Sequence, residues 1–367
     1  MLFRSRCSDH DLPCLVRRAG YYGIRLRLGR DGSEPHQLQG SDLHRRQKGF
    51  GVYGRSVIDT VQLVRQYERQ VAPLPGYALP QVAAWFGCSV RHDPALPSII
   101  ADLRETTRIY RKLAPAWHIQ TQQYPAGFQA VTAKAGASVV AALLLKEQLQ
   151  KNCALPVPVQ VSGVSEQRTG ELFRKGQAGP VVMCDIAELA ASIMLAYRIA
   201  PRGEIHDLFL RLLCRQREYD HQPEVYESGA RLLPAWFELL CRPRHPLSDP
   251  YAAGEVKRLM RVITGDLLGW LREQGAEPLF ADQQVICFVP PAGQSGEQTV
   301  AGLNRRLTEL LPGAEPIRCS GQYRSIFVYS LSNYALLEQN GTLVYRGHGF
   351  AYHSMEPFML ELLKQSI

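Results

Sequence analysis

The most constraining feature of the sequence is a long amphipathic helix that leads directly into a short apolar hairpin. Residues 249–275 carry apolar side chains at helical spacing, with Asp249 placed to cap the first turn and Gly275 placed to end the helix. The stretch PLFADQQVICFVPP, at 278–291, then reads as two apolar strand halves around a polar turn that begins at Asp282. A carboxylate at such a tip is either an ordinary solvated turn residue or part of a site.

Length and composition indicate a globular protein of more than one domain. The chain has 367 residues and 46% hydrophobic content, which is enough for a large core and predicts two or three domains. Its formal charge of +8 favours polyanionic partners without identifying one. The nine cysteines include no CxxC pair, so the sequence signals neither a zinc site nor a disulfide framework. A reducing compartment fits best.

Several classes of protein find no support in the sequence. The first residues interrupt their apolar side chains with charges, and no segment has the roughly 20 uninterrupted apolar residues of a membrane span. We therefore expect a cytoplasmic protein without a membrane partner. GFGVYG at 49–54 matches GxGxxG only formally, because HRRQK precedes it instead of a buried strand. No P-loop, HExxH or GxSxG motif occurs.

Further elements follow from periodicity and turn signals. Residues 57–59 read as a short strand that continues into a helix, and 98–115 as a helix that Pro115 ends. The apolar face expected for that second helix comprises Ile99, Ile100, Leu103, Thr107, Tyr110 and Leu113. A strong helix former at 133–152 precedes an extended, Pro-punctuated connector.

The remaining signals lie in the second half of the chain. Pro180 to Cys184 reads as a buried strand that runs into a helix, with Asp185 at the junction. Residues 205–218 form an amphipathic helix, with Leu208, Leu212 and Cys214 inward and Arg211, Arg215 and Arg217 outward. Asn340-Gly341 predicts a hairpin, and a helix is expected at 355–366.

Two acids therefore stand at the ends of buried strands, Asp185 and Asp282. In phosphoryl transfer, carboxylates from neighbouring strands hold two divalent ions about 3.5–4 Å apart. Mg²⁺ favours hard oxygen ligands such as carboxylates and water. Physical reasoning alone leaves open whether these acids form a site or coincide by chance.

The sequence resembles the palm of family B DNA polymerases, particularly their bacterial members. The resemblance runs through DIAELAASIMLAYRIAP, the helix at 249–275, EPLFADQQVICFVPP and YRSIFVYSLSNYALLEQNGTLVYRG followed by SMEPF. Upstream, it resembles the proofreading exonuclease domain that precedes that palm, in SDHDLPCLVRRAGYYGIRLRLGRDGSEP, GRSVIDTVQLVRQY and IIADLRETTRIYRKL. The stretches follow one another in the family's order over most of the chain, which makes the resemblance specific.

The resemblance implies an α/β (α+β) protein with two parts. Residues 1–122 would be a ribonuclease H-like exonuclease domain that lacks its first metal motif. Residues 123–367 would be a palm with an antiparallel sheet and a short fingers insertion at about 200–247, without a thumb.

In the palm, the resemblance keeps the frame and changes the chemistry. The family's Asp-x-x-Ser-Leu-Tyr-Pro-Ser becomes a motif that begins with Asp185 and has Ala190 at the tyrosine position. The family's Asp-Thr-Asp becomes Asp282-Gln283-Gln284, so an amide stands where the resemblance expects a principal metal ligand. Asp185 and Asp282 are thus expected to be vestigial catalytic acids and weak metal ligands.

Residues that would contact nucleotide or DNA are altered in the same way. Arg231 takes the place of the fingers lysine, and Pro234 in that motif is expected to disturb the helix. Asn333 and Tyr334 remain from a Lys-x-Lys-Asn-Tyr pattern whose lysines have become serines. Arg211 and Arg215 are further candidates for a phosphate track, in a set that also includes Arg217, Arg242 and Arg244, or they form a solvated face.

The exonuclease half keeps two of four expected acids. The resemblance assigns Asp11 to the second metal motif, with Arg6 at its usual asparagine position. It assigns Asp102 to the third motif, with Ser98 where a tyrosine would orient the attacking water. Two acids would not hold two metals, so Asp11 and Asp102 are expected to be vestigial.

We therefore expect a catalytically degenerate polymerase-like protein that binds DNA or serves as a scaffold in replication or repair, with a possible protein subunit as partner. No cofactor is expected to bind tightly, and Mg²⁺ would be needed if activity remains. One alternative is an active nucleotidyltransferase using Asp185 and Asp282, with Glu188 either as a substitute ligand or as a solvated acid at a helix start. Another is a protein–protein interaction module that does not bind DNA.

Overall fold

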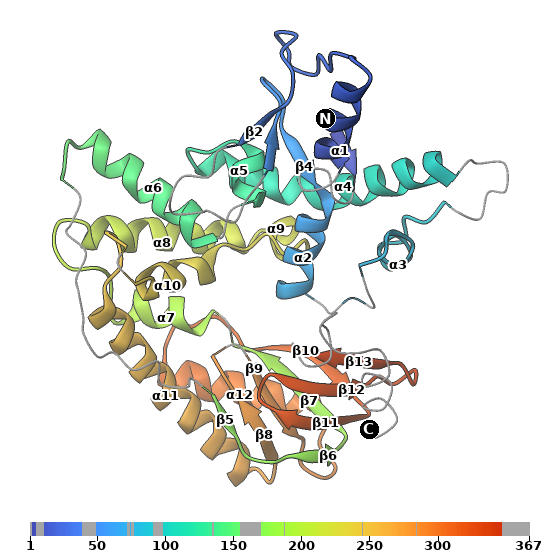
Figure 1. The fold of residues 1–367 in the computed structure, drawn as a ribbon. Helices are drawn as coiled ribbons and strands as arrows, with labels where there is room; N and C mark the ends of the chain where they lie inside the picture. Colours follow the sequence, from blue (N-terminus) through green and yellow to red (C-terminus); the bar gives the residue numbers. More distant parts are fainter. Residues whose placement is uncertain are drawn as a thin grey trace. The chain divides into compact units, whose positions relative to one another are not determined.

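The long helix and the hairpin form where the sequence predicts them. In the computed structural model of the protein, α11 (Pro250–Glu273) is followed by β8 (Glu277–Ala281) and β9 (Val285–Val289) (Figure 1). The Asp249 side chain accepts hydrogen bonds from the backbone N–H groups of Tyr251 and Ala252, and so caps the helix. Gly275 follows the helix with a positive φ of 81°, a conformation in which glycine is favoured.

The described part of the chain divides into two compact units. One unit comprises residues 1–153 and 217–232, and the other comprises 154–216 and 233–367. The structure describes residues 2–4, 11–38, 49–71, 74, 77–90, 98–133, 136–154, 170–186, 188–243, 245–283 and 285–346.

This division differs from the single boundary expected near 122. The long helix α4 (Ser98–Gln123) does end there, but α5 (Phe128–Ala133) packs on α4, and α6 (Gly136–Gln150) packs on α5. Those two helices therefore stay with the first unit. The assignment of residues 1–122 as exonuclease-like remains a prediction.

The second unit is built on a five-stranded sheet with strand order β10-β7-β9-β8-β5. Its pairs are all antiparallel, as the sequence resemblance predicts, and its other strands are β5 (Glu171–Leu172), β7 (Val181–Asp185) and β10 (Arg318–Tyr323). Val181 to Cys184 are all buried. A strand buried on both faces needs cover on both sides of the sheet.

Helices cover one face of this sheet. α11 contacts β8, and α12 (Gly296–Leu310) contacts β7 and β10, with the two helices packed on each other (Figure 1). Ser295 and Gln298 form a capping box that begins α12. α7 (Leu189–Ala196) and α10 (Leu233–Cys241) pack on α11 and on each other.

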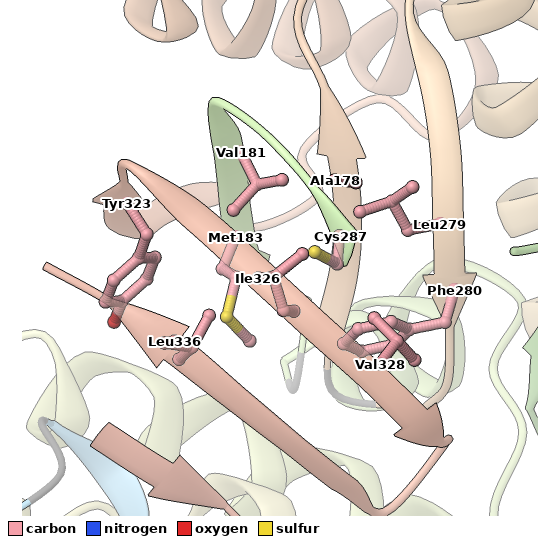
Figure 2. Packing of buried hydrophobic residues seen from close by; sticks show 10 residues of the cluster. All are labelled: Ala178, Val181, Met183, Leu279, Phe280, Cys287, Tyr323, Ile326, Val328 and Leu336. Atoms are coloured by element: carbon pink, nitrogen blue, oxygen red, sulfur yellow. The ribbon is translucent and has the colours of Figure 1, made fainter. Parts of the chain in front are cut away.

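A second sheet covers the opposite face. Its order is β13-β12-β11-β6, formed by β6 (Gly176–Ala178), β11 (Ser325–Ser330), β12 (Asn333–Leu337) and β13 (Leu343–Arg346). Figure 2 shows the apolar side chains that fill the space between the sheets, among them Met183, Phe280, Cys287, Ile326 and Leu336. This core fixes the strand ends on which the acids stand.

The chain passes between the two sheets at Gly179, directly before β7. A side-chain carbon at this position would collide with the carbonyl oxygen of Arg324, where the chain crosses back from β10 to β11. The close approach of the two crossings therefore requires glycine here.

The first unit contains helices and two strand pairs in its described residues. β1 (Leu2–Arg4) pairs in parallel with β4 (Val57–Asp59), and β2 (His36–Leu38) pairs antiparallel with β3 (Gly49–Gly51). The predicted strand-to-helix step at 57–59 is confirmed, because α2 (Thr60–Gln70) begins at once with Asp59 as its cap. The other helices are α1 (Leu12–Tyr21), α3 (Leu79–Trp85) and α9 (Pro223–Glu227). Whether this unit is ribonuclease H-like stays a prediction.

Two expectations about α4 are wrong. The helix does not end at Pro115 but runs through it to Gln123. Pro115 lies on the exposed face, where water can satisfy the carbonyl group that the missing N–H leaves free. The buried face differs in part from the expected one. Tyr110 and Leu113 are buried as predicted, but Ile99, Ile100 and Leu103 are exposed. Polar Glu105, Thr106 and Gln120 are buried instead, with Ile109 and Trp117.

Other sequence predictions have mixed outcomes. The hairpin at Asn340-Gly341 forms between β12 and β13, and the helix former at 133–152 is α6. α8 (His206–Asp220) is amphipathic with Arg211 and Arg215 exposed, but Cys214 is exposed instead of inward. Residues 155–163 of the expected connector at 154–163 and the expected helix at 355–366 lie outside the described residues.

The eight described cysteines are all free thiols. Within the described ranges, no helix has the length and apolar character to span a membrane.

Candidate functional site

The two strand-end acids lie in one row across the five-stranded sheet. Asp185 ends β7 and stands opposite Val285, the first residue of β9. Asp282 directly follows β8, and its backbone N–H donates to the carbonyl oxygen of Val285 at 2.9 Å. Neighbouring strands are about 4.8 Å apart, so the backbones of Asp185 and Asp282 are separated by about 10 Å. Directly opposed residues project to the same face, so both carboxylates lie on one side of the sheet.

Asp282 is held by its own turn. Its Oδ1 atom accepts a hydrogen bond from the backbone N–H of Val285 at 2.7 Å, which closes the turn between β8 and β9. One carboxylate oxygen is thus engaged within the hairpin. Gln284, the amide expected in place of an acid, lies outside the described residues.

A cation extends the row on its other side. Arg318, on β10, is the register partner of Asp185 in the antiparallel pair of β10 and β7. Directly opposed side chains have their Cβ atoms about 4.5–5.5 Å apart, and opposite charges in such pairs attract. Asp185 is therefore flanked by an arginine, which the sequence analysis did not single out. The pairing of β10 with β7 joins residues more than a hundred positions apart, so no local pattern signals it.

A small pocket opens beside Asp282. It has a volume of about 80 Å³ and is lined by Asp282 and Gln283 of the turn, by β5, and by one face of α11 that carries Lys257, Arg261 and Thr264. The helix that precedes the hairpin thus places two cationic side chains near the turn acid. The sequence shows that Lys257 and Arg261 are four residues apart and so share one face of the helix, but it does not show that this face lies beside the turn.

The motif that begins at Asp185 continues into a buried helix start. Glu188 precedes α7 and is buried, so the expectation of a solvated acid is wrong. Its carbonyl oxygen accepts a hydrogen bond from the hydroxyl of Ser192, and that hydroxyl accepts one from the backbone N–H of Glu315, which ties the helix start to the segment before β10. Ala190, at the position where the resemblance places a tyrosine, is also buried. Half-buried Asp185 therefore faces solvent more than Glu188 does.

Arg231 is buried in the first unit, where its side chain is bonded to Gln70. Only 4% of its surface is exposed, and its guanidinium donates to the backbone carbonyl of Gln70 at 2.7 Å. The Gln70 side chain in turn pairs with the backbone N–H and carbonyl of Arg231, both at 3.0 Å. The guanidinium also lies 4.5 Å from the ring centre of Tyr226. These contacts are those of a structural arginine.

Pro234 does not disturb the helix of the fingers-like motif, contrary to the expectation. It is the second residue of α10, and the first turn of a helix has no intrahelical acceptor for its N–H groups. Proline is tolerated at that position for this reason.

The other candidate DNA contacts are placed on separate elements. Arg211 and Arg215 are exposed on α8, Arg217 and Arg242 are half-buried, and Arg244 lies outside the described residues. The side-chain amide of Asn333 donates to the Ser330 hydroxyl at 3.0 Å, across the turn between β11 and β12. Tyr334 packs its ring 5.2 Å from that of Phe280, and burial raises the pKa of its hydroxyl to about 12.

The exonuclease candidates lie on different helices of the first unit. Asp11 stands at the start of α1, and Asp102 lies in the first turns of α4, both half-buried. Ser98 begins α4 and is exposed, whereas Arg6 lies outside the described residues. No separation between the two acids follows from these positions.

Comparison with known proteins gives the same relationship as the sequence motifs. No family model matches the chain. A DNA polymerase from Pyrococcus glycovorans is 26% identical over 93% of this chain. The structure of the family B DNA polymerase from the hyperthermophilic archaeon Pyrobaculum calidifontis matches 92% of this chain with a TM-score of 0.70, at 19% identity. The chain resembles family B DNA polymerases in both sequence and fold.

The likeness to these polymerases covers only part of them. The chain spans about half the length of each relative, 51% in both comparisons. The matched structure comes from an archaeon, and the expected closeness to bacterial members stays a prediction. The mixed fold with an antiparallel sheet in the second unit agrees with the fold of the polymerase.

Proposed function

We propose that this family B polymerase-like chain no longer polymerises DNA efficiently and acts as a DNA-binding or scaffold component in replication or repair. Loss of one ligand from an electrostatic site costs on the order of a thousandfold in rate. A small number of changed side chains is therefore enough to remove most of the activity while the fold is kept. In agreement with eight free thiols, we also propose that the protein works in the reducing cytoplasm.

The observation that carries the proposal is the row at the end of β7. It sets Arg318 opposite Asp185, so a fixed positive charge competes there with any divalent cation. At the other end of the row, Asp282 has one oxygen engaged with Val285, and the sequence supplies an amide at 284. An amide is a neutral ligand and cannot replace the charge of a carboxylate toward Mg²⁺.

Arg231 supports the same conclusion from the first unit. A side chain that grips a triphosphate must offer its guanidinium to solvent, whereas that of Arg231 donates to Gln70 and is buried. Its hydrogen bonds with Gln70 are internal to the unit, which supports a packing role for the position aligned with the fingers lysine.

Metal binding tests the proposal directly. Titration with Mn²⁺, followed by electron paramagnetic resonance, is expected to show weak binding to the wild-type protein. Gln284→Asp should tighten binding by at least about tenfold, because it restores a charged oxygen ligand. Gln283→Asp is the matched control, since it adds the same charge one position away and should change binding less. Wild-type affinity equal to that of Gln284→Asp would contradict the proposal.

Primer extension and DNA binding on the same preparation test the two halves of the function. We expect no extension with Mg²⁺ or Mn²⁺, and DNA binding that falls steeply between low and physiological salt. Absence of DNA binding even at low salt would favour the alternative of a protein–protein interaction module. Extension that Asp185→Ala abolishes and Asp207→Ala leaves intact would show an active enzyme; Asp207 is an exposed acid on α8.

The second candidate function is a nucleotidyltransferase, and the shared sheet face of the two acids favours it. Both acids are half-buried and stand in one row of the sheet, and carboxylates are the ligands that a hard cation prefers. Asp185 and Asp282 would then hold Mg²⁺, which supplies a Lewis acid when it is bound. Extension that depends on both acids would establish this candidate over the first.

A further inference from the structure

A cluster of exposed aromatic and basic side chains lies where α1 ends in the first unit. Tyr21 is 84% exposed and Tyr22 is 62% exposed, and their rings meet edge to face with centres 5.1 Å apart. Ile24 follows, also exposed. Single exposed apolar side chains are common, but adjacent ones that no core explains mark contact surfaces.

The segment at 25–28, which follows this cluster, is fixed in place by its leucine side chains. Leu28 packs against the buried cluster of Leu12, Val52 and Val57, and the carbonyl oxygen of Leu28 accepts a hydrogen bond from the Arg55 side chain at 2.7 Å. Because Leu26 and Leu28 are half-buried, the alternating residues Arg25 and Arg27 project into solvent. The arginines are therefore presented by an anchored backbone.

Among the described residues, the arginines of this surface are not held in ion pairs, although the exposed acids Asp31 and Glu34 lie in the same segment. Arg17, Arg18, Arg25, Arg27 and Arg30 are all exposed, and within the described ranges none of their guanidinium groups forms an ion pair. A position near the carboxyl end of α1 explains Arg18 through the helix dipole. The helix dipole does not explain Arg25, Arg27 and Arg30, which lie beyond the helix.

A neighbouring loop extends the aromatic surface. The backbone N–H of Arg30 donates to the carbonyl oxygen of Tyr53 at 3.0 Å, which brings the exposed Tyr53 beside this arginine. Between α1 and the following segment lies a hollow of about 320 Å³, lined by the last turns of α1, by residues 23–26 and by Glu34 and Pro35. Arg25 and Ile24 thus stand at the edge of a concave surface.

We propose that this surface, defined by Tyr21, Tyr22, Tyr53 and the five arginines, binds single-stranded DNA. Exposed rings offer stacking faces to unpaired bases, and the guanidinium groups between them neutralise the phosphates. Duplex DNA would use only the arginines, because its bases are already stacked. The inference rests on the proposed DNA-binding function and assigns it to a surface separate from the palm acids.

The test is fluorescence anisotropy of the full chain with a labelled oligothymidylate of about 16 nucleotides and with a duplex of equal length. Tyr21→Ala/Tyr22→Ala should weaken single-strand binding by about tenfold or more and leave duplex binding nearly unchanged. Tyr21→Phe/Tyr22→Phe should bind like the wild type, because the ring is kept. Tyr197→Ala, an exposed tyrosine of the second unit, is the matched control and should have no effect.

The contribution of the arginines is measured separately, through the salt dependence of single-strand binding. Arg25→Gln/Arg27→Gln should lower the slope of log affinity against log salt by about 1.4, since each phosphate contact with a single strand contributes about 0.7. Loss of that slope with the tyrosines intact supports the phosphate contacts on this surface.

The outcomes separate this inference from the proposed function. If the wild-type protein binds neither oligonucleotide at low salt, the proposed DNA binding fails and this inference fails with it. If it binds both but Tyr21→Ala/Tyr22→Ala binds single strands as well as the wild type does, only the present inference is overturned. An equal loss for duplex and single strand would also overturn it, because stacking on unpaired bases would not be the cause.

Discussion

At the scale of single residues, Arg231 and Gln70 show how a charged side chain can become part of a core. The Gln70 amide satisfies both backbone polar groups of Arg231, and the Arg231 guanidinium satisfies the carbonyl of Gln70. Each interaction closes a group that would otherwise be buried without a partner. The sequence motif could not reveal this, because the two residues lie 161 positions apart.

Gln70→Ala should lower the free energy of unfolding of the first unit by about 2 kcal/mol, since it leaves the backbone N–H and carbonyl of buried Arg231 without their partners. Urea denaturation followed by circular dichroism measures the change. Gln62→Ala, on the same helix and likewise half-buried, should shift stability by less than about 0.5 kcal/mol. Equal effects of the two variants would show that the paired amide contributes nothing specific.

At the scale of elements, the sequence predicted most helices and strands. It did not predict the effect of Pro115 and Pro234 on their helices or the full buried face of α4. The hairpin at 277–289, the step from β4 to α2 and the capped start of α11 all follow from local patterns. The buried face of α4 did not, because polar Glu105 and Gln120 are buried through partners elsewhere in the unit. The row that joins Arg318 to Asp185 also required the strand order.

Pro115 and Pro234 test whether the position of a proline in its helix decides its effect on stability. Pro115 lies inside α4 on its exposed face, where alanine restores one backbone hydrogen bond without a packing change. Pro115→Ala should therefore raise the free energy of unfolding by about 1–3 kcal/mol. Pro234→Ala, in the first turn of α10, restores no such bond and should bring no gain. Thermal or urea unfolding of both variants decides, and an equal gain in each would contradict the explanation.

At the scale of the whole molecule, the chain does not divide at one point. It leaves the first unit after residue 153 and returns for 217–232 before it completes the second. Sequence order suggests one boundary because it records only which residues are adjacent, whereas the returning segment is held by side chains far away in the chain. The carboxylate of Asp220, 1% exposed, accepts hydrogen bonds from the Gln120 side chain at 2.7 Å and from the backbone N–H of Leu232 at 2.8 Å.

Asp220→Ala should release this returning segment. It removes the acceptor of the Gln120 side-chain N–H and of the Leu232 backbone N–H, and hydrogen bonds to a charged group contribute about 1.5–3 kcal/mol each. Because Arg231 is buried in the same segment, trypsin cleaves after it only when the segment opens. When opening is fast relative to cleavage, the rate follows the open population, so cleavage after Arg231 should accelerate by tenfold or more, as about 1.4 kcal/mol is a factor of ten. Mass spectrometry of the early fragments measures this.

Glu224→Ala, an exposed acid of the same segment, is the control and should cleave at the wild-type rate. A wild-type rate for Asp220→Ala would mean that other contacts hold the segment in the first unit.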